Sequence, residues 1–214
     1  MHRICGRLRT GVDTHTIQNT LMFMGDDGNN NLHMGDANTA AEETAKQHPG
    51  FLVKKVMWDA YKRGRSATGY IYPDVRKTII GQQERGALVM DYAGHGSEIQ
   101  LSDETVLRLN DFASFTNKNL PLWITASCDI MPFDGTTPTI GETALLNERG
   151  GAMAFYGTTR TVYAIYNKPM NMAYLKHVLD RPNGIANTLG EAARLARTEM
   201  ITKGLDLTSN KLDF

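Results

Sequence analysis

A histidine and a cysteine each stand at the end of an apolar run, and together these residue types can form a thiolate nucleophile. His95 lies in G-A-L-V-M-D-Y-A-G-H-G-S (residues 86–97), and Cys128 lies in L-P-L-W-I-T-A-S-C-D (residues 120–129). Apolar runs bounded by turn residues are typical of strands buried on both faces. A helix predicted at 109–116 favours a βαβ unit. Because parallel strands bring their carboxyl ends together, we expect the two side chains to share one crevice, although 33 residues separate them (128 − 95).

The chemistry expected of this pair is acyl transfer through the cysteine thiolate. His95 would take the thiol proton and later protonate the leaving amine. It stands between Gly94 and Gly96, and glycine allows a ligand to approach the main chain closely. The backbone N–H groups of Gly96 and Cys128 are therefore predicted to form an oxyanion hole. The alternatives are a small buried cysteine without reactivity and a histidine that merely occupies a turn.

Two aspartates, Asp26 and Asp27, follow the first predicted strand. One of them is expected to accept a hydrogen bond from the His95 imidazole and fix its tautomer; ordinary turn chemistry is the alternative. The spacing does not fit a calcium loop and the ligands are too few for structural zinc, so we predict no metal and no cofactor. A Cys5–Cys128 disulfide stays open, but two cysteines do not make a disulfide framework. The remaining histidines are interpreted as surface or capping residues: His2, His15, His33, His48 and His177.

The order of the predicted elements indicates an α/β fold with a mostly parallel sheet and helices on both faces. Strands are predicted at 20–25, 51–58 and 150–156, and in the two runs that lead to His95 and Cys128. Helices are predicted at 39–47, 74–84, 109–116, 139–147, 167–179 and 188–202, with T-x-x-E capping boxes at Thr39, Thr139 and Thr188. Residues 61–73 are interpreted as a basic surface loop, and residues 210–214 as the beginning of a strand.

Composition argues against several classes of protein. Lys plus Arg and Asp plus Glu each number 23, and this balance disfavours a nucleic-acid-binding surface. No stretch approaches the roughly 20 apolar residues of a membrane span, and the first residues lack the apolar core of a signal peptide. We interpret residues 1–18 as a loop or a remnant of an upstream element.

The motifs A-G-H-G-S (93–97) and T-A-S-C-D (125–129) resemble those of the gingipain-type cysteine peptidases of the caspase-like clan. The caspase signature Q-A-C-[RQG]-G is absent. Within the family, the chain is most similar to the sortase-type members of the type IX secretion system, over residues 21–214. Further stretches carry this similarity: D-D-G-N-N-N-L-H-M at 26–34, D-A-Y-K at 59–62, G-E-T-A-L-L-N at 141–147, G-G-A-M-A-F-Y-G-T-T-R at 150–160 and N-K-L-D-F at 210–214.

The resemblance implies a caspase-hemoglobinase fold with a catalytic Cys/His dyad, here Cys128 and His95. Because family members are longer, it also implies that residues 19–214 are one catalytic domain, truncated at both ends, and that residues 1–18 are a remnant or linker. It implies that Asp27 is the acidic residue that orients the histidine. The acidic residue of the family's specificity pocket falls near Asp36, and the aromatic residue of the pocket wall falls near Tyr163. An acidic pocket residue such as Asp36 would favour substrates with basic side chains.

For sortase-type members, the resemblance implies cleavage of the C-terminal secretion signal from cargo proteins. The acyl group is then transferred to an amine of surface lipopolysaccharide. The implied partners are the cargo C-terminal domains and other type IX secretion components, with no nucleic acid. The implied location is the extracellular face of the outer membrane, as part of a longer protein. A gingipain-like endopeptidase that only hydrolyses, and an inactive module that binds cargo, are the alternatives.

Overall fold

A five-stranded parallel sheet forms the centre of the computed structural model, which describes residues 19–67 and 69–204. The strand order is β10-β9-β5-β1-β2, and each neighbouring pair is parallel. The strands are β1 (Thr20–Gly25), β2 (Leu52–Met57), β5 (Val89–Ala93), β9 (Leu122–Ala126) and β10 (Ala154–Tyr156). The predicted mostly parallel α/β fold is confirmed.

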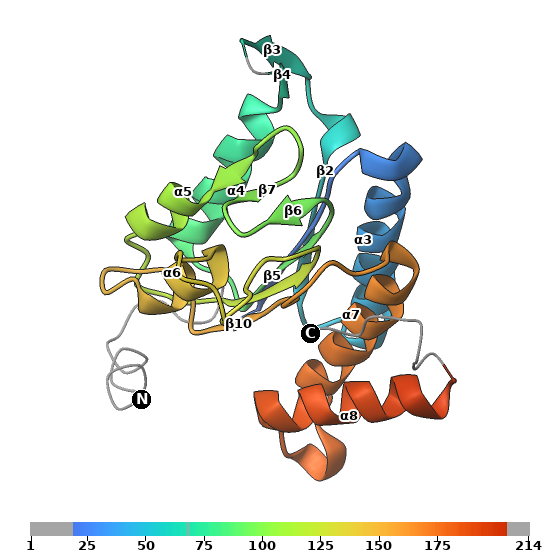
Figure 1. The fold of residues 1–214 in the computed structure, drawn as a ribbon. Coiled ribbons are helices and arrows are strands. Elements are labelled where there is room, and N and C mark those ends of the chain that lie inside the picture. Colours follow the sequence, from blue (N-terminus) through green and yellow to red (C-terminus); the bar gives the residue numbers. More distant parts are fainter. Residues whose placement is uncertain (1–18, 68, 205–214) are drawn as a thin grey trace.

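Helices cover both faces of the sheet (Figure 1). On one face lie α3 (Gly28–Gln47), α7 (Ala164–Leu179) and α8 (Leu189–Thr202), and on the other lie α4 (Pro73–Arg85), α5 (Leu109–Ser114) and α6 (Ile140–Leu146). Alternation along β1 decides which core each residue joins, since successive side chains of a strand point to opposite faces. Leu21 and Phe23 pack in the core that contains α7 and α8 residues, whereas Met22 and Met24 pack in the core that contains α4 residues.

Short elements connect and flank the sheet. An antiparallel pair, β3 (Gly64–Ser66) and β4 (Gly69–Ile71), occupies part of the segment that we predicted to be a loop, so that prediction is wrong there. Past β5, the chain forms a small antiparallel sheet from β6 (Gly96–Ser97), β7 (Gln100–Leu101) and β8 (Leu107–Arg108). Within residues 19–67 and 69–204, the other elements are the 3₁₀ helices η1 (Trp58–Ala60) and η2 (Pro182–Gly184).

The start of α3 differs from the prediction. The predicted cap at Thr39 is wrong, because Thr39 lies inside the helix and its hydroxyl donates to the Gly35 carbonyl at 2.8 Å. The chain enters α3 through Asn29, Asn30 and Asn31, whose φ angles of 52°, 55° and 64° are left-handed. Asparagine is one of the few residue types that adopt this conformation readily. A polar, asparagine-rich stretch that reads as a turn therefore leads directly into a long helix.

The other two predicted caps are present. Thr139 and Glu142 form both hydrogen bonds of a capping box at α6, and Thr188 accepts from the Glu191 N–H at α8. Among the described residues, no helix is long and apolar enough to cross a membrane. The predicted segments 1–18 and 210–214, with Cys5, His2 and His15, lie outside the described residues.

Candidate active site

His95 and Cys128 follow neighbouring parallel strands at matched positions. Ala93 of β5 pairs with Ala126 of β9, and each candidate residue comes two positions after its alanine. The Gly94 N–H donates to the Ala126 carbonyl at 3.3 Å, which extends the contact between the strands past their last paired residues. Both candidate residues therefore leave the sheet at the same edge, as the pattern of the sequence predicted. The His95 side chain is 38% exposed, and Cys128 is half-buried.

The Cys128 thiol is free and lies against the segment that follows β10. Its Sγ donates to the Val162 carbonyl at 3.4 Å. Two further hydrogen bonds hold the loop that contains Cys128 (residues 127–131, the cysteine loop) to this segment. The Thr158 hydroxyl donates to the Ser127 carbonyl at 2.5 Å, and the Met131 N–H donates to the Thr158 carbonyl at 3.0 Å. In the described part of the chain, no hydrogen bond joins the Cys128 and His95 side chains. The structure places the two residues at one edge, and the dyad itself stays a prediction.

Asp26 holds the main chain of His95 in place. Its Oδ2 accepts the His95 N–H at 2.7 Å. The Tyr92 hydroxyl lies 2.7 Å from the His95 carbonyl oxygen and 2.9 Å from the same Oδ2, so its proton is shared between these two acceptors. The histidine backbone is thus fixed on both its N–H and its C=O side. The sequence left open which of the two aspartates would accept from the His95 imidazole. Among the described residues, Asp26 accepts from the His95 backbone N–H instead, and neither aspartate has a hydrogen bond to the imidazole.

His33 completes this network, and its interpretation as a surface or capping residue is wrong. It is 7% exposed, its Nδ1 lies 2.6 Å from Asp26 Oδ1, and its ring meets the His95 ring edge-on with centroids 4.8 Å apart. Asn29 Nδ2 lies 3.1 Å from Nε2 of His33, so polar partners hold both nitrogens of this ring. The residue escaped prediction because it lies in a polar stretch without apolar periodicity.

The Asp26 carboxylate stays ionised although it is buried. Burial by itself raises the pKa of this carboxyl, because it removes water from the charged form. Hydrogen bonds from His33, the His95 N–H and Tyr92, with the charge of His33, outweigh burial and lower the pKa of Asp26 below its ordinary value. At neutral pH a negative charge therefore lies against the His95 main chain.

Asp27, the expected orienting residue, makes different contacts. Its Oδ2 accepts from the Tyr72 hydroxyl at 2.6 Å and lies 4.0 Å from the Arg63 guanidinium. Burial and the bond to Asp27 raise the pKa of Tyr72. No hydrogen bond of Asp27 to His95 is present among the described residues, so its orienting role stays a prediction.

Two glycines pack against the candidate pair. A Cβ added to Gly96 would lie 2.3 Å from the hydroxyl oxygen of Ser127, the residue before Cys128. A Cβ added to Gly28 would lie 2.6 Å from Cδ2 of His95. The Gly96 backbone is thus close to the cysteine loop, as an oxyanion hole would need, although that role stays a prediction. The Gly28 contact was not anticipated.

The two expected specificity residues lie on different elements. Asp36 of α3 has a 12% exposed side chain whose Oδ1 is 3.1 Å from Nζ of Lys168 on α7. Tyr163 directly precedes α7 and is 59% exposed. Asp36 lines a small cavity at the carboxyl edge of the sheet, together with Ala93 and Ala126. The structure does not place Tyr163 among the residues that line this cavity.

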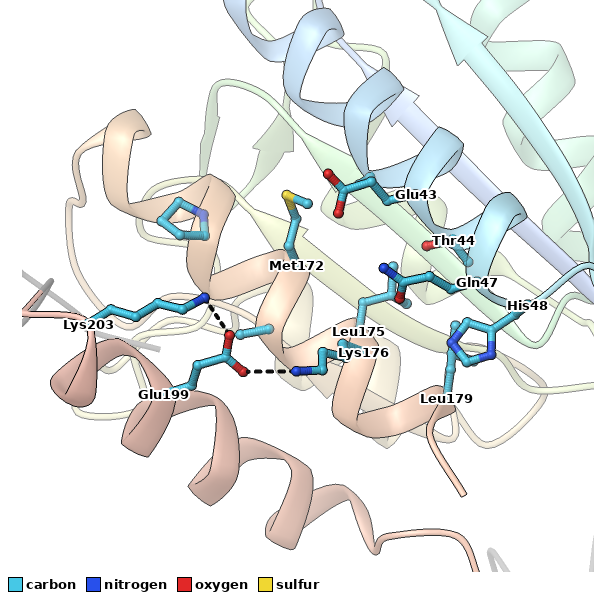
Figure 2. Close-up of a pocket in the computed structure, with 13 residues that line it drawn as sticks. Glu43, Thr44, Gln47, His48, Met172, Leu175, Lys176, Leu179, Glu199 and Lys203 are labelled. Carbon is cyan, nitrogen blue, oxygen red and sulfur yellow. Dashed lines mark hydrogen bonds and ion pairs between the residues drawn. The ribbon is translucent and has the colours of Figure 1, made fainter. Parts of the chain in front are cut away.

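A separate groove of about 220 Å³ lies between α3, α7 and α8 (Figure 2). Its wall includes His48 and Leu179, and Glu199 bridges Lys176 and Lys203 across it. None of the predicted site residues lines it. His48 ends α3, and His177 contacts Glu199 at 3.2 Å. In the described residues, no group of three or more His, Cys, Asp and Glu side chains is arranged to hold a metal ion.

Comparisons with known proteins agree with this architecture. The model of peptidase family C25 matches residues 7–213. The crystal structure of the Arg-specific cysteine proteinase gingipain R is similar with a TM-score of 0.66 and 19% identity, over 89% of this chain and 43% of the solved one. None of the curated proteins matches the chain.

Two more solved structures are similar. The complex of the Porphyromonas gingivalis RgpB pro- and mature domains has a TM-score of 0.66 and 17% identity, over 90% of this chain and 44% of that one. A structure described as a protease has a TM-score of 0.71 and 17% identity, over 97% of this chain and 47% of that one. The chain thus spans less than half the length of these structures, and likeness at this identity establishes the fold. With the family match across nearly its whole length, the chain belongs to peptidase family C25, the gingipain-like cysteine peptidases.

Proposed function

We propose that the chain is the catalytic domain of a surface sortase of the type IX secretion system, similar to PorU. It cleaves the C-terminal secretion signal from cargo and transfers the acyl group to an amine of surface lipopolysaccharide. One observation carries the proposal: His95 and Cys128 each follow, by two residues, the paired alanines Ala93 and Ala126 of adjacent parallel strands. A nucleophile and a base are thereby delivered to one edge of the sheet from distant parts of the sequence.

The proposed reaction has two halves that share one thioester. In the first, the Cys128 thiol transfers its proton to His95 and attacks the scissile carbonyl carbon. The tetrahedral oxyanion collapses, the C–N bond breaks, and His95 gives the proton to the departing amine. In the second, an amine or water loses a proton to His95 and attacks the thioester, and the thiolate leaves and regains that proton. Transfer and hydrolysis differ only in which nucleophile attacks.

The surroundings of the pair support this chemistry. Asp26 accepts from the His95 N–H and the Tyr92 hydroxyl donates to the His95 carbonyl, so the imidazole starts from a defined position. The Gly96 and Cys128 N–H groups are proposed to bind the oxyanion. Asp27 is proposed to orient His95 together with the Tyr72 hydroxyl, which donates to it.

The proposed partners are the C-terminal domains of cargo proteins, other secretion components and the lipopolysaccharide amine, at the outer face of the outer membrane. One solved relative is described as a complex of pro- and mature domains, and a comparable protein partner is proposed for this chain.

Two other functions are favoured by particular observations. The likeness to gingipain R, described as an Arg-specific proteinase, favours an endopeptidase that only hydrolyses. The bond between Cys128 Sγ and the Val162 carbonyl favours an inactive module that binds cargo, because it occupies the thiol that His95 would activate.

The first experiment measures whether Cys128 is activated. In a Cys5→Ser background, iodoacetamide should alkylate Cys128 of the full chain near pH 7 at least about tenfold faster than in the His95→Ala variant. His48→Ala, which changes a histidine at the far end of α3, is the matched control and should leave the rate unchanged. Equal rates in all three proteins would favour the inactive module.

The second experiment distinguishes transfer from hydrolysis. The chain is incubated with a library of quenched fluorescent peptides, with and without glycinamide as the amine, and products are identified by mass. A surface sortase should form peptide–glycinamide conjugates and a Cys128 acyl-enzyme that Cys128→Ala abolishes. Cleavage with only hydrolysed products at high glycinamide concentration would indicate the hydrolase instead.

A further inference from the structure

We propose that Lys168 is a specificity-determining residue. By pairing with Asp36, Lys168 closes the cavity beside the candidate dyad. The cavity then accepts only substrates in which the residue that supplies the scissile carbonyl is small and uncharged: glycine, alanine or serine. The inference rests on the proposed function for its assignment to a substrate, and it reverses the expectation that Asp36 favours basic side chains.

The cavity lies next to both reacting groups. Ala93 and Ala126 line it, and these are the last residues of β5 and β9, two positions before His95 and Cys128. His33, another wall residue, contacts the His95 ring edge-on. Ala164 lines the cavity two positions after Val162, whose carbonyl accepts from Cys128 Sγ. A peptide carbonyl at Cys128 would therefore have its own side chain at this opening.

The charge of Asp36 is already matched inside the protein. Lys168 Nζ lies 3.1 Å from Asp36 Oδ1 and 3.4 Å from the Thr39 hydroxyl, and Asp36 is only 12% exposed. A substrate lysine or arginine would have to displace this ammonium group or lie beside it, and a like charge nearby opposes binding. An acidic substrate side chain would in turn be repelled by the Asp36 carboxylate. The pair therefore selects against both signs of charge.

The size of the cavity sets the second limit. About 10 Å³ is free for the centre of a water molecule, which is room for roughly one water. Small side chains form much of its wall: Ala40, Ala93, Ala126 and Ala164. Two wall residues, Asn167 and Asn171, have buried amide oxygens without a hydrogen-bond partner in the described part of the chain. These acceptors can bind a serine hydroxyl, since a buried acceptor gains most from a donor that reaches it.

The test compares peptides that differ only in the residue that supplies the scissile carbonyl. For the wild-type chain, kcat/KM for glycine, alanine and serine peptides should exceed that for arginine and lysine peptides by at least about 30-fold. Lys168→Ala should raise kcat/KM for arginine and lysine peptides by at least about tenfold, because it frees both the volume and the Asp36 charge. The same substitution should change kcat/KM for the alanine peptide by less than about threefold.

Two variants separate charge from volume. Lys168→Met with Asp36→Asn removes the charges and keeps most of the bulk, so it should not gain activity on arginine peptides. Lys176→Ala, which removes a lysine on the same helix that pairs with Glu199 instead, should leave the preference unchanged. The inference is overturned if the wild-type chain cleaves arginine peptides as fast as alanine peptides, or if Lys168→Ala leaves the preference as it was.

Failure of the proposed function gives a different result. If no variant cleaves any peptide, calorimetric binding of butylguanidinium tests the charge selectivity of the pocket independently of catalysis. Lys168→Ala should then bind this cation and the wild-type chain should not. No binding by the variant, or equal binding by both proteins, overturns the inference.

Discussion

Replacing Gly28 with alanine is the sharpest probe of the candidate site, because the added methyl group presses mainly on the His95 ring and leaves the chemistry of every side chain intact. The added Cβ would lie 2.6 Å from His95 Cδ2 and 2.8 Å from Nε2, whereas carbon atoms pack at roughly 3.5–4.0 Å. The imidazole must therefore shift by about 1 Å. His33 is packed against the ring, so the shift leads toward solvent.

A displacement of about 1 Å in a reacting group costs on the order of 100-fold in rate. We expect Gly28→Ala to lower both kcat and the iodoacetamide alkylation rate of Cys128 by about this factor. Overpacking should also reduce the free energy of unfolding by about 1–3 kcal/mol. Thermal denaturation measures this stability change separately from the kinetics.

Gly35→Ala is the matched control on the same helix. A Cβ at Gly35 meets no atom within 4 Å, so this variant should keep full activity and gain roughly 0.5–1 kcal/mol in stability. If folded Gly28→Ala kept its alkylation and cleavage rates within about threefold of wild type, the argument that His95 must stay in its observed position would be refuted.

Three further predictions concern stability, measured by chemical denaturation. Asp26→Asn should be less stable than wild type by about 3 kcal/mol at pH 7, because it weakens buried bonds to a charged group. Since the pKa of Asp26 is lowered on folding, this difference should shrink as the pH falls below about 4. A difference that stays constant with pH would contradict this prediction. Asp91 is the opposite case: burial raises its pKa to about 7 despite its bond to Asn171, so the wild type loses stability as the pH rises from about 4 to 7. Asp91→Asn should be more stable by up to about 4 kcal/mol at pH 8 and equal at pH 4; no gain at pH 8 would show that folding does not raise the pKa of Asp91. Thr139→Ala should lose about 1 kcal/mol through the cap that it forms with Glu142, whereas an unchanged value would mean that this cap is not formed in solution.

Much of the architecture was predictable because it depends on local pattern. The runs before His95 and Cys128 are mostly apolar, as strands covered on both faces require, and β5 and β9 are fully buried, Asp91 and Thr125 included. The caps at Thr139 and Thr188 depend on a hydroxyl and a glutamate three residues apart, which is also a local signal. The cap at Thr39 failed because the same spacing occurs inside a helix that had already begun.

The network around His95 was not predictable in the same way. His33 follows a run of polar residues, and nothing local distinguishes a buried histidine bonded to Asp26 from one in a surface turn. Gly28 likewise reads as a turn glycine, and only the fold places the His95 ring above it.

By itself, the sequence determined which residues have the chemistry and which strands carry them, because residue type and hydrophobic period are properties of short segments. Only the tertiary structure decided what surrounds those residues. Asp36 and Lys168 are 132 residues apart (168 − 36), and their pairing depends on how α3 and α7 pack on one face of the sheet. An acidic side chain alone predicts a pocket for basic substrates. Its charge partner, which long-range packing supplies, determines whether that negative charge remains available to a substrate.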